Sequence, residues 1–383
     1  MKEEVLVSHR HDLVRVLHGR AGSWVETRTI EGGSWPTVGP DGSIVVTAVE
    51  LTEEGRRARL DLVDPAGGRL TVPGSPTATF ITPRLPIYSS WGPGGSRLAF
   101  VSSDGESIAL STWRADDPEA SPLRLTSGMP LFHAWRPEGD ALAVHAGEDL
   151  SVFSPDGDRL ETVSGGAAGF RVPAWSDDGR LLAWAHLKDE VLEVLVRESG
   201  QDTAVARFEG GGAVAFRPHS HDLAVAVAGR PETGAFDSLH ILRLGNERAT
   251  GSVISDPFVA FAWSPDGTRL AMVVPAQSGD GRYRTVIRDP DGRVLASSEA
   301  VVPSIDTRLT LGFFDQYRLS QPWWSPESDG LLLCGRLAGD AVSDSFGDPA
   351  GGFAYWWSRT RRTGLTVVGA ADVACFAPAT GRT

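Results

Sequence analysis

One short phrase limits what this chain can fold into more than any other feature. In "FAWSPDGTRLAMVV", residues 261–274, an apolar segment ends at a tryptophan, enters Ser264-Pro265-Asp266-Gly267, and continues into a second apolar segment. Proline presets a turn torsion, aspartate accepts local backbone hydrogen bonds, and glycine tolerates torsions that other residues avoid. The flanking apolar residues alternate with the period of two that strands require. The phrase therefore predicts a β-hairpin.

The same phrase recurs along the chain in a fixed phase. An aromatic or apolar residue stands two places before each turn. The turn positions are Pro40, Pro93, Pro137, Asp177, Pro218, Pro265 and Pro326, preceded by Val38, Trp91, Trp135, Trp175, Phe216, Trp263 and Trp324. Successive turns are 40 to 61 residues apart, and each interval carries two further strand-like segments. Four strands in roughly 40–45 residues is the period of a β-propeller blade. We therefore expect an all-β fold in which residues 1–383 form a single β-propeller domain.

The two ends of the chain complete the count of blades. The C-terminal "DVACFAPATGRT" repeats the first half of the phrase, with Phe376 in the aromatic place and Pro378 in the turn place. The N-terminal segments "EEVLVSH", "DLVRVLHG" and "SWVETRTI" read as three strands. One C-terminal strand and three N-terminal strands would close a last blade, for eight four-stranded blades in total. The alternative is seven blades with loose tails.

Composition fits one large core and restricts the kinds of partner. Twelve tryptophans supply core mass, since each large aromatic buries roughly 150–250 Å². We expect most of them to stack between blades; Trp323, beside the repeat Trp324, stands outside the pattern. A net charge of −13 argues against nucleic acid, because phosphate binding needs a basic face. The ratio of 34 arginines to 2 lysines is typical of a high-GC bacterial genome.

The termini and the cysteines indicate a cellular location. The N-terminal "MKEEVLVSHRHD" has no apolar signal core, and no segment approaches the length of a membrane span. Cys334 and Cys375 lie on strand-like segments and read as buried thiols rather than as a disulfide framework. We expect a cytoplasmic, monomeric protein without membrane insertion.

Catalytic motifs are missing from the sequence. It contains no G-x-S-x-G, no H-E-x-x-H, no phosphate loop and no dinucleotide fingerprint. Two H-x-H pairs, His9 with His11 and His219 with His221, could contribute to a metal site only if further ligands converged on them. Turn and solvated positions explain both pairs, and we expect no catalytic residue, no metal and no cofactor.

The W-S-P-D-G-x-R-L-A repeats resemble the WD40-like propeller repeats of TolB and of the N-terminal propellers of dipeptidyl-peptidases and prolyl-oligopeptidases. In those peptidases catalysis resides in a fused hydrolase domain, and this chain ends inside its own repeats. The sequence also departs from TolB in lacking a signal sequence and a domain before the propeller. The segment "LGFFDQYRLSQPWWSPES", residues 311–328, resembles TolB-like proteins encoded near bacterial ABC transporters, which implies a transporter component as partner.

The longest links between expected strands, one before the seventh repeat and one inside it, are the candidate binding loops. Residues 296–321 and 336–352 fall on the face opposite the repeated turns, and long loops on a rigid scaffold often carry binding. Aromatic side chains stand beside charged ones there, the mixture favoured in interface anchors. The candidate binding residues are Phe313, Phe314, Asp315, Gln316, Tyr317 and Arg318. The alternative is that Phe313 and Phe314 only hold a long loop onto its blade.

Two classes of function remain open at this point. The first is a non-catalytic scaffold that binds a protein or peptide through its loop face, and the repeats and the candidate loop favour it. The second is a propeller enzyme, a hydrolase or lyase with its site around the pore. That class requires histidines and carboxylates from several blades to meet at the axis.

Overall fold

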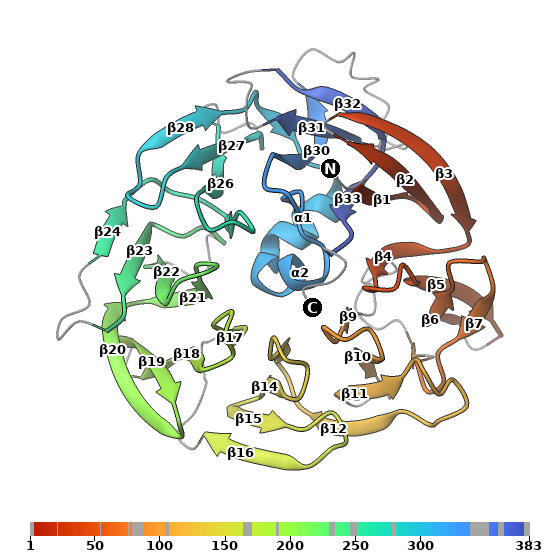
Figure 1. Cartoon of the computed structure of the whole chain (residues 1–383), viewed down its shortest axis with the longest axis horizontal. Coiled ribbons are helices and arrows are strands. Elements are labelled where there is room, and N and C mark those ends of the chain that lie inside the picture. Colours follow the sequence, from red (N-terminus) through yellow and green to blue (C-terminus); the bar gives the residue numbers. More distant parts are fainter. Residues whose placement is uncertain are drawn as a thin grey trace. The chain divides into compact units, whose positions relative to one another are not determined.

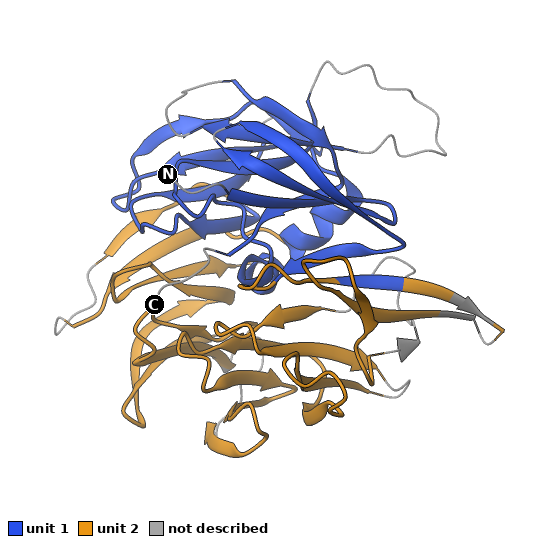
Figure 2. Cartoon of the chain, turned by 45° about the vertical axis from the view of Figure 1, so that its right-hand side comes forward, with its two compact units in different colours: residues 1–38, 46–48, 258–383 blue, residues 39–45, 49–257 orange. Residues whose placement is uncertain are grey.

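A computed structural model of the chain shows two compact units (Figure 2). Unit 1 comprises residues 1–38, 46–48 and 258–383, and unit 2 comprises residues 39–45 and 49–257. The residues that the structure describes are 4–20, 22–53, 55–75, 77–78, 88–103, 107–163, 171–188, 191–229, 234–245, 251–276, 281–337, 352–358 and 364–378.

Unit 2 contains four sheets of four antiparallel strands each, every sheet built from consecutive strands (Figure 1). In chain order the strands are β9 (Ser89–Trp91), β10 (Arg97–Ser103), β11 (Ile108–Arg114) and β12 (Leu123–Ser127); β13 (Leu131–Trp135), β14 (Leu142–Ala146), β15 (Asp149–Phe153) and β16 (Arg159–Val163); β17 (Ala174–Trp175), β18 (Leu181–Lys188), β19 (Val191–Glu198) and β20 (Gln201–Glu209); β21 (Gly211–Phe216), β22 (Asp222–Ala228), β23 (Ser238–Arg243) and β24 (Gly251–Ile254).

One further sheet consists of strands β4 to β8. Its order is β4-β5-β6-β7, and β8 also pairs with β6. The bounds of its strands are β4 (Ser34–Val38), β5 (Ile44–Thr52), β6 (Gly55–Val63), β7 (Arg69–Thr71) and β8 (Thr77–Ala78).

Unit 1 holds the blades at both ends of the chain. One sheet has the order β3-β2-β1-β33, and a second runs from β25 to β32, where the short β29 joins β27 to β30. Trp324 bridges to Leu331 and so takes the innermost place beside β30. The strands are β1 (Glu4–Arg10), β2 (Leu13–Arg20), β3 (Ser23–Glu31) and β33 (Val373–Phe376); β25 (Ala260–Trp263), β26 (Leu270–Pro275), β27 (Tyr283–Arg288), β28 (Val294–Ser297) and β29 (Val301–Val302); β30 (Gly330–Leu337), β31 (Phe353–Ser358) and β32 (Thr366–Ala370).

The hydrogen bonding of the described residues thus gives eight four-stranded groups and confirms the β-propeller prediction. The last blade is formed as expected from one C-terminal and three N-terminal strands. Leu6 pairs with Phe376 and His9 with Val373, so β33 lies beside β1. This pairing excludes seven blades with loose tails. The assignment of residues 1–383 to a single domain stays a prediction.

Side chains within the repeated phrase explain why its turn needs serine and aspartate. The Ser264 hydroxyl donates to Asp266 at 2.6 Å, and the same Oγ accepts from the Arg269 amide at 3.0 Å. The Asp266 carboxylate also accepts from the Thr268 amide, and Gly267 takes a positive φ of 67°. The turn of residues 176–181 repeats the arrangement, with Ser176 donating to Asp178 at 2.6 Å. Asp266 therefore closes a turn.

The repeat tryptophans tie neighbouring blades together through their indole N–H groups. Trp175 donates to the Ala134 carbonyl at 3.3 Å, one residue before Trp135 in the preceding blade. Trp135 donates in the same way to Ser90, and Trp324 to Ala262. The surrounding apolar clusters also combine neighbouring blades, and one of them joins β14, β18 and β22 around the buried Trp184. The expected stacking of tryptophans between blades is seen at these positions.

The link 296–321 is partly helical and not a loop. Ser304 caps α1 (Ile305–Gly312) by accepting from the Thr307 amide, and α2 (Phe314–Ser320) follows directly. In the other long link, residues 338–351 lie outside the described residues.

Candidate functional site

The helical segment, residues 304–320, is fixed to the innermost strands of unit 1. The hydroxyls of Ser304 and Thr307 both donate to the Asp372 carbonyl at 2.7 Å, which ties the start of α1 to the residue before β33. The Phe314 ring lies 5.2 Å from Phe261 of β25. These contacts hold α1 and α2 on strands that are more than 100 residues apart in sequence.

A second group of contacts joins the helical segment to β4. The Tyr317 ring lies 5.8 Å from Trp35, and the Gln321 amide donates to the Pro36 carbonyl at 3.3 Å. Trp35 has a positive φ of 52°, which is uncommon for a residue with a side chain. Its amide donates to His9 Nδ1 at 3.1 Å, so this strained residue is held from two sides.

The six predicted binding residues divide according to their burial. Phe314, Asp315, Gln316 and Tyr317 are buried, Arg318 is half-buried, and Phe313 is 44% exposed. Phe314 and Tyr317 therefore hold the helices in place. The alternative interpretation, in which Phe313 and Phe314 both fix the link to its blade, fits the buried Phe314 and not the exposed Phe313. The binding role of the six residues stays a prediction, and Phe313 and Arg318 are the members that solvent reaches.

Sequence reasoning missed three exposed residues of the same segment. Ile305 is 48% exposed, Leu319 is 46% exposed, and Arg308 is exposed on the same side of α1 as Ile305. The Arg308 amide donates to the Ser304 carbonyl at 3.0 Å, and its side chain makes no ion pair or hydrogen bond with the residues that the structure describes. The helix-capping pattern at Ser304, followed by an acidic first turn at Asp306, could have revealed the start of the helix.

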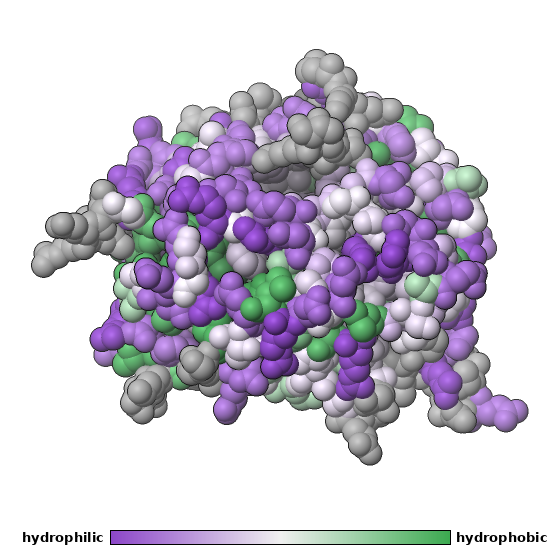
Figure 3. All heavy atoms as spheres, turned by 60° about the horizontal axis from the view of Figure 1, so that its bottom comes forward, coloured by the Kyte–Doolittle hydropathy of each residue, from purple (hydrophilic) through white to green (hydrophobic). Residues whose placement is uncertain are grey.

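Most other exposed apolar side chains stand singly on outermost strands. Examples are Val25 of β3, Leu160 of β16, Val294 of β28 and Val367 of β32. The face of the molecule shown in Figure 3 is mainly hydrophilic, with small separate apolar groups. Single exposed apolar residues are normal on soluble proteins. The helical segment differs because three exposed large apolar side chains, Ile305, Phe313 and Leu319, lie within 15 residues.

The pair of His9 and His11 does not form a metal site. His9 is fully buried, its Nε2 lies 3.3 Å from Asp306, and its Nδ1 accepts from Trp35. His11 is exposed in the turn after β1. Both ring nitrogens of His9 are thus committed, and its contacts position α1 instead.

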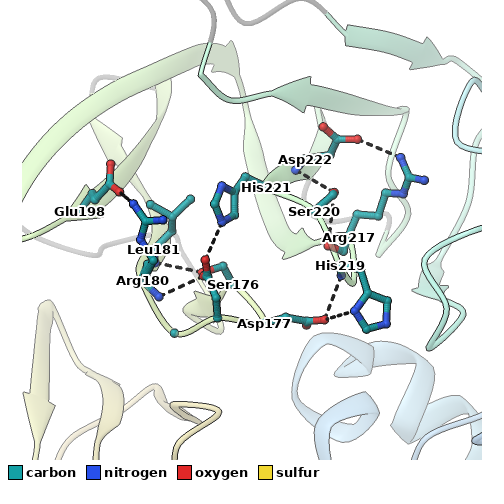
Figure 4. Close-up of polar contacts among 12 residues, drawn as sticks. Ser176, Asp177, Arg180, Leu181, Glu198, Arg217, His219, Ser220, His221 and Asp222 are labelled. Atoms are coloured by element: carbon teal, nitrogen blue, oxygen red, sulfur yellow. Dashed lines mark hydrogen bonds and ion pairs between the residues drawn. The ribbon is translucent and has the colours of Figure 1, made fainter.

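The pair of His219 and His221 joins two neighbouring turns (Figure 4). The His219 amide donates to Asp177 at 2.9 Å, and His221 Nε2 lies 2.9 Å from Asp178. The pKa of Asp178 is lowered to about 2, first by the Ser176 hydroxyl and then by His221. The two histidines meet different carboxylates, and all four side chains are exposed. The four side chains form a solvent-exposed contact between two turns.

One serine and histidine pair has the spacing of a catalytic nucleophile and its general base. Ser90 of β9 and His133 of β13 lie on adjacent innermost strands, with Oγ and Nε2 2.8 Å apart. Both are buried, and burial lowers the pKa of His133 to about 3. A general base works best when its pKa lies near the operating pH. The pair is therefore a buried hydrogen bond between blades.

The described residues contain no group of three or more histidine, cysteine, aspartate or glutamate side chains placed to hold a metal ion. Within the same part of the chain, neither helix has the length and apolar character that crossing a membrane requires.

Comparisons with known proteins agree with the fold. No protein-family model matches the chain, and no curated protein matches its sequence. The C-terminal WD40 domain of Sif2 is similar with a TM-score of 0.52 at 14% identity, over 77% of this chain and 82% of that chain. TolB from Acinetobacter baumannii is similar with a TM-score of 0.41 at 16% identity, over 88% and 83% of the two chains. A eukaryotic initiation factor is similar with a TM-score of 0.47 at 11% identity, over 78% and 96%. Identities this low show a distant likeness in fold alone.

Proposed function

We propose that this β-propeller binds a protein or peptide partner, without catalysis, through the exposed side of the helical segment. The observation that carries the proposal is the exposure of Ile305, Phe313 and Leu319 on helices that are otherwise pinned by buried side chains. A rigid platform lowers the entropy cost of binding, and aromatic anchors carry much of the affinity of protein interfaces.

Charge on the segment indicates the chemistry of the partner. Arg308 is exposed, and Arg318 is half-buried at the end of α2. The two acidic residues of the segment do not offer a charge to a partner, because Asp306 pairs with His9 and Asp315 is buried. The exposed charges of the segment are therefore positive on a chain whose net charge is −13. A partner segment that combines apolar and acidic side chains fits this surface, and complementary charge favours the correct partner.

The partner class to be tried first is a protein component of a bacterial ABC-type transporter, on the resemblance of residues 311–328 to such transporter-associated proteins. The alternative of a propeller enzyme has no comparable support. Among the described residues, the Ser90 and His133 pair is buried and His133 is a weak base.

The test compares two double variants in quantitative affinity capture, followed by calorimetry with the purified partner. Phe313→Ala with Leu319→Ala removes two exposed anchors. The matched control is Val294→Ala with Val367→Ala, which truncates equally exposed apolar residues on the outermost strands of unit 1. Loss of an anchor costs about 2 kcal/mol or more, which is roughly thirtyfold in affinity.

We expect the helix variant to lose affinity and the control to retain it. Surface substitutions change stability within about 0.5 kcal/mol, so both variants should melt like the parent protein. Equal capture by the parent and the helix variant would contradict the proposal. Tyr317→Ala is unsuitable for this purpose, because the buried Tyr317 ring packs on Trp35 and its loss would disturb the fold.

A further inference from the structure

A small pocket lies beside α1 in unit 1. It has a volume of about 60 Å³ and is partly open to solvent. Its walls come from β26, β27, β29 and β30 and from the start of β33. Thr310 and Leu311, the buried residues of α1, also line it. The pocket therefore adjoins the helix whose exposed side carries the proposed partner surface.

The lining of the pocket is mainly aliphatic. Examples are Val273 of β26, Val301 of β29, and Leu331 and Leu333 of β30. The described residues that line it include no aspartate, glutamate, lysine or arginine. An apolar group that enters from solvent is removed from water there, which favours its binding.

The volume selects the size of that apolar group. A cavity of about 150 Å³ accepts benzene, which is roughly 25 Å³ for each ring carbon. A volume of about 60 Å³ therefore takes about two or three carbon atoms. The side chain of valine is of this size, whereas the ring of phenylalanine is too large. The pocket is suited to one small aliphatic side chain.

Arg308 lies at the edge of the pocket. It follows Thr307, which lines the pocket, and a Cβ placed on Gly281 would lie 3.6 Å from Arg308 Nη2. Gly281 stands two residues before Tyr283, another lining residue at the start of β27. The Arg308 side chain is exposed and makes no ion pair or hydrogen bond with the residues that the structure describes. A positive charge is therefore available between α1 and the start of β27.

A carboxylate suits this guanidinium, because arginine presents its N–H donors in a fork that matches two carboxylate oxygens. In an extended peptide, side chains of neighbouring residues point to opposite sides. An acidic residue next to a valine would therefore direct its carboxylate away from the pocket. At the end of a chain, the α-carboxylate and the side chain stand on the same Cα. A C-terminal valine thus offers both groups to a pocket and an arginine that adjoin each other.

From the size and lining of the pocket and the position of Arg308, we propose that this site binds the C-terminus of a partner protein that ends in valine or in a residue of similar size. The side chain enters the pocket, and the α-carboxylate pairs with Arg308. This inference rests on the proposed function, since it names the part of the partner that meets α1.

The test is calorimetric titration of the full chain with short acetylated peptides at millimolar concentration. Acetyl-Gly-Gly-Gly-Val with a free carboxylate should bind. Its C-terminal amide, which lacks the charge, should bind at least tenfold more weakly, and so should the free acid that ends in phenylalanine. Acetyl-Gly-Val-Asp-Gly amide carries its carboxylate on an internal side chain, and binding as tight as that of the first peptide would overturn the assignment to a C-terminus. No detectable binding of the first peptide would overturn the whole proposal.

Two arginine variants assign the ion pair. Arg308→Gln should lower the affinity for the free acid to that for the amide and leave the amide unchanged. Arg284→Gln is the matched control, because Arg284 is exposed on β27 between Tyr283 and Thr285 and its side chain points to the opposite face from these two lining residues. The preference for the free acid should persist in the control. An unchanged preference in Arg308→Gln would refute the pairing of the carboxylate with Arg308.

A third variant tests the pocket itself. Cys334→Leu adds a larger side chain to the lining from β30 and should abolish binding of the free acid. If this variant does not fold, the peptide ending in phenylalanine still tests the size limit, and binding of that peptide as tight as the valine peptide would refute it.

This inference and the proposed function fail separately. If Phe313→Ala with Leu319→Ala captures the partner normally while the valine peptide binds, the pocket stands and the wider helix surface is refuted. If that double variant loses the partner while the valine peptide does not bind, the helix surface stands and the pocket is refuted.

Discussion

The blade shared by the two ends of the chain depends on Phe376, and its substitution should be among the most destabilising in unit 1. Phe376 is 1% exposed and lies 5.8 Å from Trp24 and 5.9 Å from Trp356, ring to ring. It pairs with Leu6, which is fully buried. Replacing a buried phenylalanine by alanine removes its burial and leaves a cavity, at a cost of about 3–5 kcal/mol. That is a large share of the roughly 5–15 kcal/mol that stabilises a typical native protein.

Thermal unfolding followed by tryptophan fluorescence measures this effect. Unfolding entropy of roughly 2.1 cal/mol/K per residue gives about 0.8 kcal/mol/K for this chain, so Phe376→Ala should lower Tm by about 4–6 °C. Phe353→Ala is the control, since Phe353 is 36% exposed, and should lower Tm by about 1 °C or less. Deletion of residues 373–383 should be more severe than Phe376→Ala, because it also leaves β1 without its neighbour. Equal melting of the two alanine variants would refute the closure of the blade by β33.

Two further changes test the interior. The pKa of Glu4 is raised to about 7, first by burial and then by the charge of Asp329. Between pH 4.5 and 7 the native state therefore keeps a proton that the unfolded chain releases. The free energy of unfolding should fall as the pH rises through this range. Glu4→Gln should flatten that slope and add about 2–3 kcal/mol at pH 8 in urea unfolding, and identical slopes in both proteins would contradict it. Trp175→Phe removes the indole bond to Ala134 and should cost about 1–2 kcal/mol, whereas an unchanged midpoint would show that this bond contributes nothing.

The blades could be predicted from sequence because the signal for each is local. Ser264, Asp266 and Gly267 close their turn by contacts among neighbours, and the same residues recur with one period. The pairing of β1 with β33 followed from the phase of Phe376 relative to the other repeats. That one pairing between distant residues was inferred from the local phase of the repeats.

The helical segment depends on contacts between distant residues. Ser304 signals a helix start, but α1 and α2 have only 8 and 7 residues, and such short helices are marginal without tertiary packing. The burial of Phe314 and Tyr317 comes from Phe261 and Trp35, and sequence pattern places neither partner beside them. The exposure of Phe313 beside the buried Phe314 was therefore beyond prediction.

The pairing of Leu6 with Phe376 also sets an order of events during synthesis on the ribosome. The two residues are 370 positions apart. At roughly 5–20 residues per second, β1, β2 and β3 are made about 20–75 s before β33 exists. During that interval β1 presents an unpaired strand edge, a template for joining another chain. Because β33 is made last, β1 of a partly synthesised chain keeps an unpaired edge that can pair with a neighbouring chain on the same polysome.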